Sequence, residues 1–399
     1  MAQDTIATIG KDLKMKDSNL GLIKSSIGGV GYNIALACHY GNKSPSCDNG
    51  SSRLVSIIGN DFAGNSILKQ LESVNFDTSG IYVSNGNSGT AQYISQHSHD
   101  GELLVACADM SIVEEDFSGH IMQQLERAKP TNIILDCNVS ASVMDKILDY
   151  KHRCGGDINI IVEPTSFPKS KRLAQAHHLT FPNNAIKLIT PTQAELESIH
   201  SAFSEKGYFE DYDNWFPMLD SLGINTEFRN RCEVLGRKPD YAILGKLFQN
   251  GTIQQSLQLL PYFQNILVKL GELGVVLVSI STSVQDHKSI PTTSQYHPRF
   301  TVTSTGTKIN DNHMGVVIQY YPIPQENVDL NIKNVTGAGD SFLGYLVARL
   351  LSEYPLWLEP EISTVEQEWN KWESIYKAQL ASGLSLMSDA SISPQLVQI

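Results

Sequence analysis

Short apolar runs alternate with longer amphipathic stretches along most of this 399-residue chain, and this alternation limits the fold more than any other feature. It predicts the α/β class, with a mostly parallel sheet and helices on both of its faces. The expected strands are 53–59, 132–136, 158–162, 186–189, 265–270 and 274–280, and the first expected helices are 63–73 and 141–151.

A second pattern interrupts this alternation at 89–109. Two runs rich in strand-forming residues flank His99-Asp-Gly101 and predict a hairpin outside the main sheet, which would form a small lid. Residues 201–260 favour helix and look like an insertion. Residues 286–312 are rich in Ser, Thr, His and Pro, and we expect a long surface loop there. We expect one domain over 1–399.

The charge balance limits the partners. The chain has 42 acidic and 30 basic residues, a net charge of −12 and a pI of about 5.4. Nucleic-acid binding needs a basic surface, so no nucleic-acid partner is expected. A small phosphate-bearing ligand stays compatible, because backbone N–H groups can bind an anion locally.

The N-terminus has no basic segment followed by an apolar stretch, and no run of about 18 apolar residues is present that could span a membrane. The six cysteines form no C-x-x-C pair, which favours reduced thiols in the cytoplasm or nucleus. The pairs His97/His99 and His177/His178 supply too few ligands for zinc.

The strongest motif is Asn334-Val-Thr-Gly-Ala-Gly-Asp340, ahead of an apolar helical run. Its small residues Gly337, Ala338 and Gly339 would let an anion approach the N–H groups at a helix N-terminus. Asp340 would then lie beside the anion. The simpler alternative is an Asp that only caps the helix behind a glycine turn.

A second glycine-rich turn, Gly28-Gly-Val-Gly31, precedes another apolar helix. No Lys-Ser/Thr follows, and the G-x-G-x-x-G spacing is absent, so neither a Walker A loop nor a dinucleotide motif is indicated. Asn33 would lie on the first helical turn, where its amide could bind a polyol. Alternatively, it only caps the helix.

Together the two segments resemble the PfkB/ribokinase family of sugar and nucleoside kinases. The family's Gly-Gly-x-x-x-Asn-x-Ala motif matches from Gly28 to Ala35, and its Asp-Thr-x-Gly-Ala-Gly-Asp motif matches up to Asp340, with Asn334 in place of the first Asp. The resemblance implies a ribokinase-like three-layer α/β/α sandwich with a small β lid at about 5–27 and 85–110. It also implies ATP and Mg²⁺ as cofactors.

Further segments resemble pseudouridine kinases within that family. These are the Asn334-Val start, Leu104-Val-Ala-x-x-Asp109, Asp136-Cys-Asn138 and Glu163-Pro-Thr-Ser, the last similar to the kinase part of eukaryotic bifunctional proteins. The group implies phosphorylation of the 5′-hydroxyl of pseudouridine. The alternatives are a kinase for another sugar or a purine nucleoside, and a non-catalytic binding module.

The resemblance also implies a role for each matching residue. Asp340 would be the catalytic base, and Gly337, Ala338 and Gly339 the anion hole. The substrate would contact Asp4, Gly28, Gly29, Asn33, Asp109 and Asn138. The nucleotide would contact Thr192, Lys269, Gly271, Gly274, Thr336, Ala378 and Gly383. Glu195 would orient the water around Mg²⁺, or else simply favour a helix N-terminus.

Further expectations concern two substituted positions and the partners. Thr192 stands where the family has Asn, which puts its metal and phosphate contacts in doubt. Asn334 lacks the charge of the family's Asp, so only weak dependence on a monovalent cation is expected. A homodimer through the lid is compatible with the resemblance, and no membrane partner is expected.

The N-terminus departs from the family pattern. Relatives have a core strand before the Asp that aligns with Asp4, and no apolar strand precedes Asp4 here. We therefore expect Asp4 to lie on a frayed terminus, with weak nucleoside binding and marginal stability.

Overall fold

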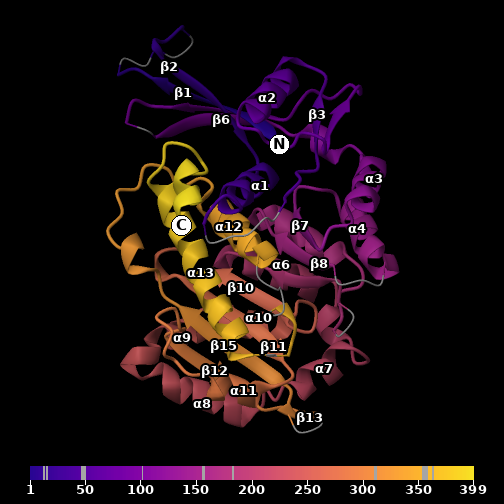
Figure 1. Ribbon diagram of the computed structural model, residues 1–399, viewed down its shortest axis with the longest axis vertical. Coiled ribbons are helices and arrows are strands. Elements are labelled where there is room, and N and C mark those ends of the chain that lie inside the picture. Colours follow the sequence, from indigo (N-terminus) through magenta and orange to yellow (C-terminus); the bar gives the residue numbers. More distant parts are fainter. Residues whose placement is uncertain are drawn as a thin grey trace.

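A seven-stranded sheet forms the centre of the computed structural model (Figure 1). The structure describes residues 1–11, 14, 17–45, 51–100, 102–154, 158–181, 184–309, 312–352, 358–361 and 364–399. The strand order is β12-β15-β11-β10-β9-β8-β7. Strands β7 to β10 run parallel, and β11, β15 and β12 continue the sheet as antiparallel neighbours.

The sheet strands have these bounds: β7 Asn132–Asp136, β8 Asn159–Glu163, β9 Ile186–Ile189, β10 Asn265–Lys269, β11 Val275–Ser281, β12 Phe300–Thr303 and β15 Gly315–Tyr321. The other strands are β1 Ala2–Ile9, β2 Gly21–Gly28, β3 Ser56–Gly59, β4 Ile81–Ser84, β5 Gln92–His97, β6 Leu103–Asp109, β13 Lys308–Ile309 and β14 Asn312–His313.

The α-helices are α1 Val30–Gly41, α2 Phe62–Ser73, α3 Ser118–Ala128, α4 Ala141–Cys154, α5 Phe167–Ser170, α6 Gln193–Glu205, α7 Trp215–Ser221, α8 Thr226–Gly236, α9 Ala242–Gln249, α10 Thr252–Leu259, α11 Val284–Ser289, α12 Ala338–Ser352 and α13 Val365–Leu386. None of the described helices is long and apolar enough to cross a bilayer.

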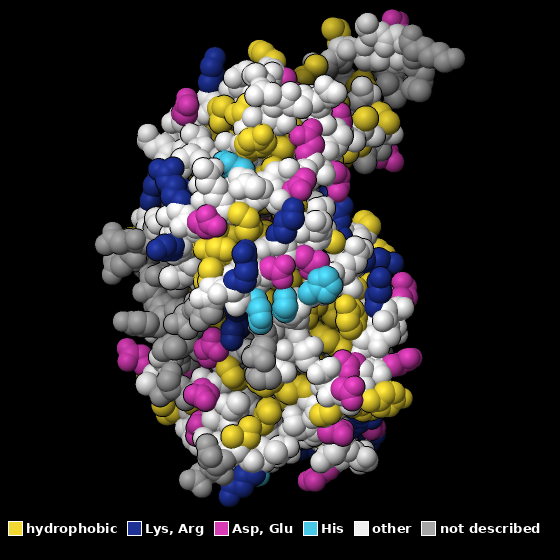
Figure 2. All heavy atoms as spheres, turned by 90° about the vertical axis from the view of Figure 1, so that its right-hand side faces the viewer, with side chains coloured by type: hydrophobic (Ala, Val, Ile, Leu, Met, Phe, Trp, Pro, Cys, Tyr) yellow, Lys and Arg dark blue, Asp and Glu magenta, His cyan; other side chains and the backbone are white. Residues whose placement is uncertain are grey.

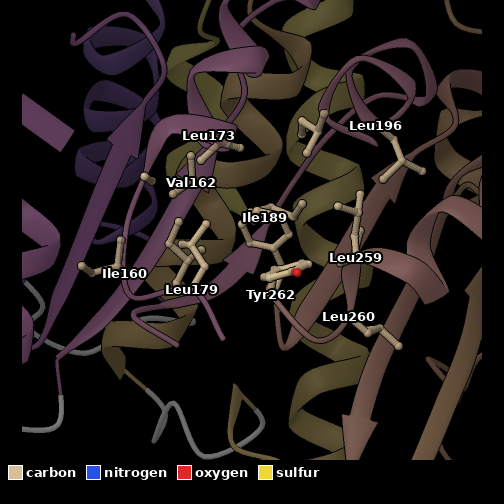
Figure 3. Close-up of a cluster of buried hydrophobic side chains, with 14 of the residues drawn as sticks. Ile160, Val162, Leu173, Leu179, Ile189, Leu196, Leu259, Leu260 and Tyr262 are labelled. Atoms are coloured by element: carbon tan, nitrogen blue, oxygen red, sulfur yellow. The ribbon is translucent and has the colours of Figure 1, made fainter. Parts of the chain in front are cut away.

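Apolar side chains alternate between the two faces of the central strands, as the period of a strand requires. On one face Ile160 and Val162 of β8 pack with residues from α4, α6 and α10, part of a cluster seen in Figure 3. On the other face Ile161 packs with residues of α1, α12 and α13. The α/β class and the layered arrangement of helices on both faces are confirmed.

A four-stranded sheet of order β2-β1-β5-β6 projects from one end of the molecule (Figure 1). It includes the expected hairpin as β5 and β6, and it begins at Ala2, three residues before the expected start of the lid. Strands β3 and β4 form a separate parallel pair.

Two expectations were wrong. Residues 286–312 are not one loop, because β12 pairs with β15 at the edge of the main sheet and α11 precedes it. Asp4 does not lie on a frayed terminus: β1 is hydrogen-bonded to β2 on one side and to β5 on the other, with Asp4 opposite Ser26 and Tyr93. Backbone pairing on both sides therefore orders this segment. Residues 201–260 are helical, with α7 to α10 in that stretch.

Candidate active site

Four neighbouring parallel strands each carry a polar residue at the carboxyl end. Asp136 ends β7, Glu163 ends β8, Thr190 follows β9 and Lys269 ends β10. Carboxyl ends of parallel strands meet at one edge of a sheet, and open α/β sheets bind ligands there. Both Glu163 oxygens accept from Lys269 Nζ at 2.8 Å, and Thr190 Oγ1 donates to Glu163 Oε2 at 2.7 Å.

The N-terminal turn of α12 faces this edge. Gly337 has φ of +84°, and a Cβ atom there would lie 2.2 Å from the Ser391 carbonyl oxygen, so only glycine fits. A Cβ at Gly339 would lie 3.2 Å from Lys269 Nζ, which places the ammonium directly against the turn. Ser382 Oγ of α13 donates to the Ala338 carbonyl at 2.8 Å. The turn is therefore fixed on two sides, with its helix N-terminus suited to an anion.

Asp340 lies in the first turn of α12 and contacts the N-terminal half of the chain. Asn33 Nδ2 donates to Asp340 Oδ2 at 2.8 Å. Asn33 itself is buried on the first turn of α1, and among the described residues its Oδ1 has no hydrogen-bond partner. A buried acceptor without a partner is unusual, and a ligand hydroxyl would satisfy it.

The pKa of Asp340 is raised to about 7, mainly by burial and further by the negative charges of Glu163 and Asp136. The hydrogen bond from Asn33 and the positive charge of Lys269 act in the opposite direction. A carboxylate with a pKa near neutrality can accept a proton from a hydroxyl and release it again at physiological pH.

Asp136 organises the backbone next to this carboxylate. Its Oδ2 accepts from Gly31 N at 2.9 Å and its Oδ1 from Asn138 N at 3.0 Å. The Asn138 side-chain oxygen accepts from Lys169 Nζ. The glycine turn before α1 and the segment after β7 are thus held together at the sheet edge.

Asp4 lies beside the same glycine turn. A Cβ at Gly28 would lie 1.9 Å from Asp4 Oδ2, so the carboxylate occupies the space that any other side chain would need. Burial raises the pKa of Asp4. Gly29, at the N-cap of α1, has φ of +105°. The sequence-predicted residues Asp4, Gly28, Gly29 and Asn33 therefore lie in one region.

Thr192 and Glu195 form a capping box at the start of α6. Glu195 Oε2 accepts from Thr192 N at 2.8 Å, and Thr192 Oγ1 accepts from Glu195 N at 3.3 Å. Thr192 bridges to Lys269 and so lies at the same edge. Helix capping accounts for Glu195 without a metal, and its role near Mg²⁺ stays a prediction.

The described residues contain no group of three His, Cys, Asp or Glu arranged to hold a metal ion. Histidines do gather beside acidic side chains on the face in Figure 2. The rings of His152 and His178 stack at 4.5 Å, while His177 pairs with Asp145 and His178 with Asp149.

Magnesium in phosphate sites keeps several waters and uses few carboxylates. Mg²⁺ bound together with a nucleotide therefore stays a prediction for the sheet edge.

The remaining predicted residues differ in how they fit. Gly271 and Gly274 lie at the β10–β11 turn next to Lys269, and Thr336 N donates to Asn334 Oδ1 at 2.9 Å, before the anion turn. Ala378 is buried on α13, and its expected contact with the nucleotide stays a prediction.

Two other predicted residues lie on elements outside the main sheet, Gly383 on α13 and Asp109 at the end of β6. A Cβ at Gly383 would lie 2.0 Å from Asn327 Oδ1, so this glycine makes room for a neighbouring side chain. Asp109 lies in the lid and accepts from Ser111, whose hydrogen bonds lower the pKa of Asp109.

Sequence reasoning gave no chemical role to Asp136 or Glu163. The signal that could have found them is a charged residue at the end of each buried strand, since parallel strands bring such residues to the same edge.

The chain has relatives in sequence among known proteins. No family model matches. The chain is 28% identical over 373 residues to a pseudouridine-metabolizing bifunctional protein of Schizosaccharomyces pombe, covering 94% of this chain and 43% of that protein. It is 32% identical over 198 residues to the pseudouridine kinase of Escherichia coli K12, covering 47% of this chain and 55% of that one. The chain thus spans about half the length of these curated relatives.

Two solved ribokinases superpose over nearly the whole chain. The Cryptococcus neoformans enzyme, in complex with ADP, has a TM-score of 0.57 at 16% identity and covers 100% of this chain and 95% of its own. The Arabidopsis thaliana enzyme, with ribose and ATP, has a TM-score of 0.56 at 15% identity, covering 99% and 94%. The chain therefore has the ribokinase-like fold, and its sequence relatives include proteins named as pseudouridine kinases.

Proposed function

We propose that this chain transfers the γ-phosphoryl group of ATP to the 5′-hydroxyl of a nucleoside, and that the nucleoside is pseudouridine. The names of the two sequence relatives support the substrate, and the nucleotide complexes of the two ribokinases support ATP as the donor. The active site is the sheet edge described above.

The contact between Asn33 and Asp340 carries this proposal. It joins a polar amide on α1 to a carboxylate at the N-terminus of α12, and it leaves Asn33 Oδ1 for a hydroxyl donor. A sugar bound between these side chains would present its hydroxyl groups to a base and its acceptor oxygen to the anion turn.

The reaction then follows from these residues. Asp340 accepts the proton of the 5′-hydroxyl while that oxygen forms a bond to the γ-phosphorus, and the bond from phosphorus to the β-phosphate oxygen breaks to release ADP. Phosphoryl transfer depends mainly on positioning and charge stabilisation. The N–H groups of residues 337–339 would bind the equatorial oxygens, which is where charge develops.

Mg²⁺ enters this scheme as part of the nucleotide substrate and would neutralise charge on the β- and γ-phosphates. Glu195 is the predicted residue for its water shell. Asp4, beside Gly28, is expected to bind ribose hydroxyls, since vicinal diols offer donors to a carboxylate.

Purified protein should be tested for ADP formation with pseudouridine, uridine, adenosine and ribose. We expect pseudouridine to be turned over best, with pseudouridine 5′-phosphate as product. Preferential turnover of ribose or adenosine would instead assign a pentose or purine nucleoside kinase. No turnover with any acceptor, despite ATP binding, would favour a non-catalytic module.

A further inference from the structure

The Glu163–Lys269 ion pair is buried directly beneath the anion turn. The Glu163 side chain is 5% exposed and that of Lys269 is 13% exposed. Both carboxylate oxygens contact the ammonium at 2.8 Å, and Thr190 fixes the carboxylate from the neighbouring strand. A pair this buried often contributes little to stability compared with apolar side chains, so a functional reason for it is worth seeking.

Three charges surround Asp340. Glu163 and Asp136 repel its ionised form, and Lys269 attracts it. Lys269 Nζ lies 3.2 Å from the Cβ position of Gly339, the residue before Asp340, so this long flexible side chain could also turn toward the Asp340 carboxylate. The bidentate contact with Glu163 opposes that movement.

The position of Lys269 relative to the turn is equally specific. The site of a Cβ at Gly339 is 3.2 Å from its Nζ, so the ammonium borders the backbone that would hold the transferred phosphoryl group. A fixed positive charge at this point would stabilise negative charge that develops during transfer.

We propose that Glu163 is a positioning residue: it holds the Lys269 ammonium against the 337–339 turn, where it faces the transferred phosphoryl group instead of pairing with Asp340. This inference rests on the proposed kinase function, and it assigns to Glu163 a role that is exerted through Lys269. Glu163 itself touches neither substrate.

The first test compares Glu163→Gln, which keeps an acceptor for Thr190, with Lys269→Met. Losing one group aimed at developing charge costs about 10²–10³-fold in kcat, and we expect Lys269→Met to fall in this range. For Glu163→Gln we expect a smaller loss in kcat with the KM for nucleoside unchanged. The acidic limb of its pH profile should move to lower pH, because Asp340 loses a repelling charge.

Lys269→Met should move the same limb to higher pH, because Asp340 loses an attracting charge. Damage that is only structural would lower the amount of active enzyme without moving the limb. The control is Glu359→Gln, which removes the negative charge from the Lys187–Glu359 contact of 2.9 Å near the amino end of β9. It should leave kcat and the limb unchanged.

Folding and the proposed function are tested separately. The double variant Glu163→Gln/Lys269→Met leaves no unpaired buried charge, so it should fold even where a single variant does not. Its kcat should be reduced at least as much as that of Lys269→Met. Calorimetry can measure the binding of ATP and of ADP in the absence of nucleoside, and so does not depend on which acceptor the enzyme uses. We expect Lys269→Met to reduce the preference for ATP over ADP by about tenfold, as for loss of a charge contact to phosphate.

A wild-type protein that prefers ATP in this way but phosphorylates no nucleoside would refute the proposed function and not the inference. The inference is overturned if Glu163→Gln has wild-type kcat, an unmoved acidic limb and an unchanged ATP preference.

Discussion

Gly344 of α12 lies against the backbone of Ile34 on α1, so closely that a Cβ at 344 would be 2.4 Å from the Ile34 carbonyl oxygen. The neighbouring residue Asn33 contacts Asp340 one helical turn earlier on α12. The close approach of these helices therefore sets the distance between the amide and the carboxylate.

Gly344→Ala should separate the helices and weaken both stability and catalysis. Overpacking of this kind typically costs about 1–3 kcal/mol, and misplacing a base by about 1 Å can cost 10²-fold in rate. Denaturant unfolding and kcat should be measured on the same preparation. Gly119→Ala is the matched control, since nothing lies within 4 Å of its Cβ position on α3. It should leave kcat unchanged and not reduce stability.

Asp340→Asn should abolish turnover and largely spare ATP binding. Removal of a general base costs about 10²–10⁴-fold. In the wild type, kcat/KM should fall as the pH drops through about 7, because the base becomes protonated. A variant with near wild-type kcat would remove Asp340 from the mechanism, and calorimetry with ATP would show whether the nucleotide site is intact.

Much of the fold follows from hydrophobic periodicity, because β7 to β11 are apolar runs bounded by helices or turns. The antiparallel edge strand β12 could not be found this way. Its four residues, Phe300–Thr303, lie within a polar stretch, and only pairing with β15 makes them a strand. The ends of strands were harder to predict than their centres: the strand expected at 53–59 is β3, which begins at Ser56.

The two motifs predicted the centre of the site, since Asn33, Asp340 and the 337–339 turn do come together. The carboxylates Asp136 and Glu163 needed the sheet order, because adjacency at one edge depends on which strands are neighbours. Ala378 lies on the expected helix with its side chain in the core, and its contact with the nucleotide is still a prediction. Helix periodicity alone does not say which face a helix buries.

The Asp340 carboxylate should also make the stability of the folded protein depend on pH. Because the pKa of Asp340 is raised from 3.8 to about 7 in the folded protein, folding favours its protonated form. Its favourable contribution is complete below about pH 4 and is lost as the pH rises through 7. Asp340→Asn should therefore raise Tm at pH 8 more than at pH 5. Equal changes in Tm at both values would contradict a buried charge at this position.

Potassium should activate the enzyme weakly or not at all. Asn334 is uncharged, and its Oδ1 already accepts from Thr336 N at 2.9 Å. Initial rates should be compared in potassium and in tetramethylammonium salts at constant ionic strength. Asn334→Asp supplies the family's charge at this position, and we expect it to increase the potassium dependence. Strong activation of the wild type would show that other oxygens bind the cation.

Pseudouridine should be preferred to uridine by at least about 10²-fold in kcat/KM, because a site that hydrogen-bonds a ring N–H rejects an analogue that lacks it. Uridine has a glycosidic bond at the ring position where pseudouridine carries this N–H, so a buried acceptor would be left unpaired.

Asp4→Ala is the control for this preference within the same site. Asp4 lies beside Gly28, on the side expected to bind the ribose, which both nucleosides share. The substitution should therefore lower kcat/KM for both by a similar factor and leave their ratio intact. Equal kcat/KM for the two nucleosides in the wild type would replace the pseudouridine assignment with a general nucleoside kinase, whereas a ratio altered by Asp4→Ala would place Asp4 near the base instead of the sugar.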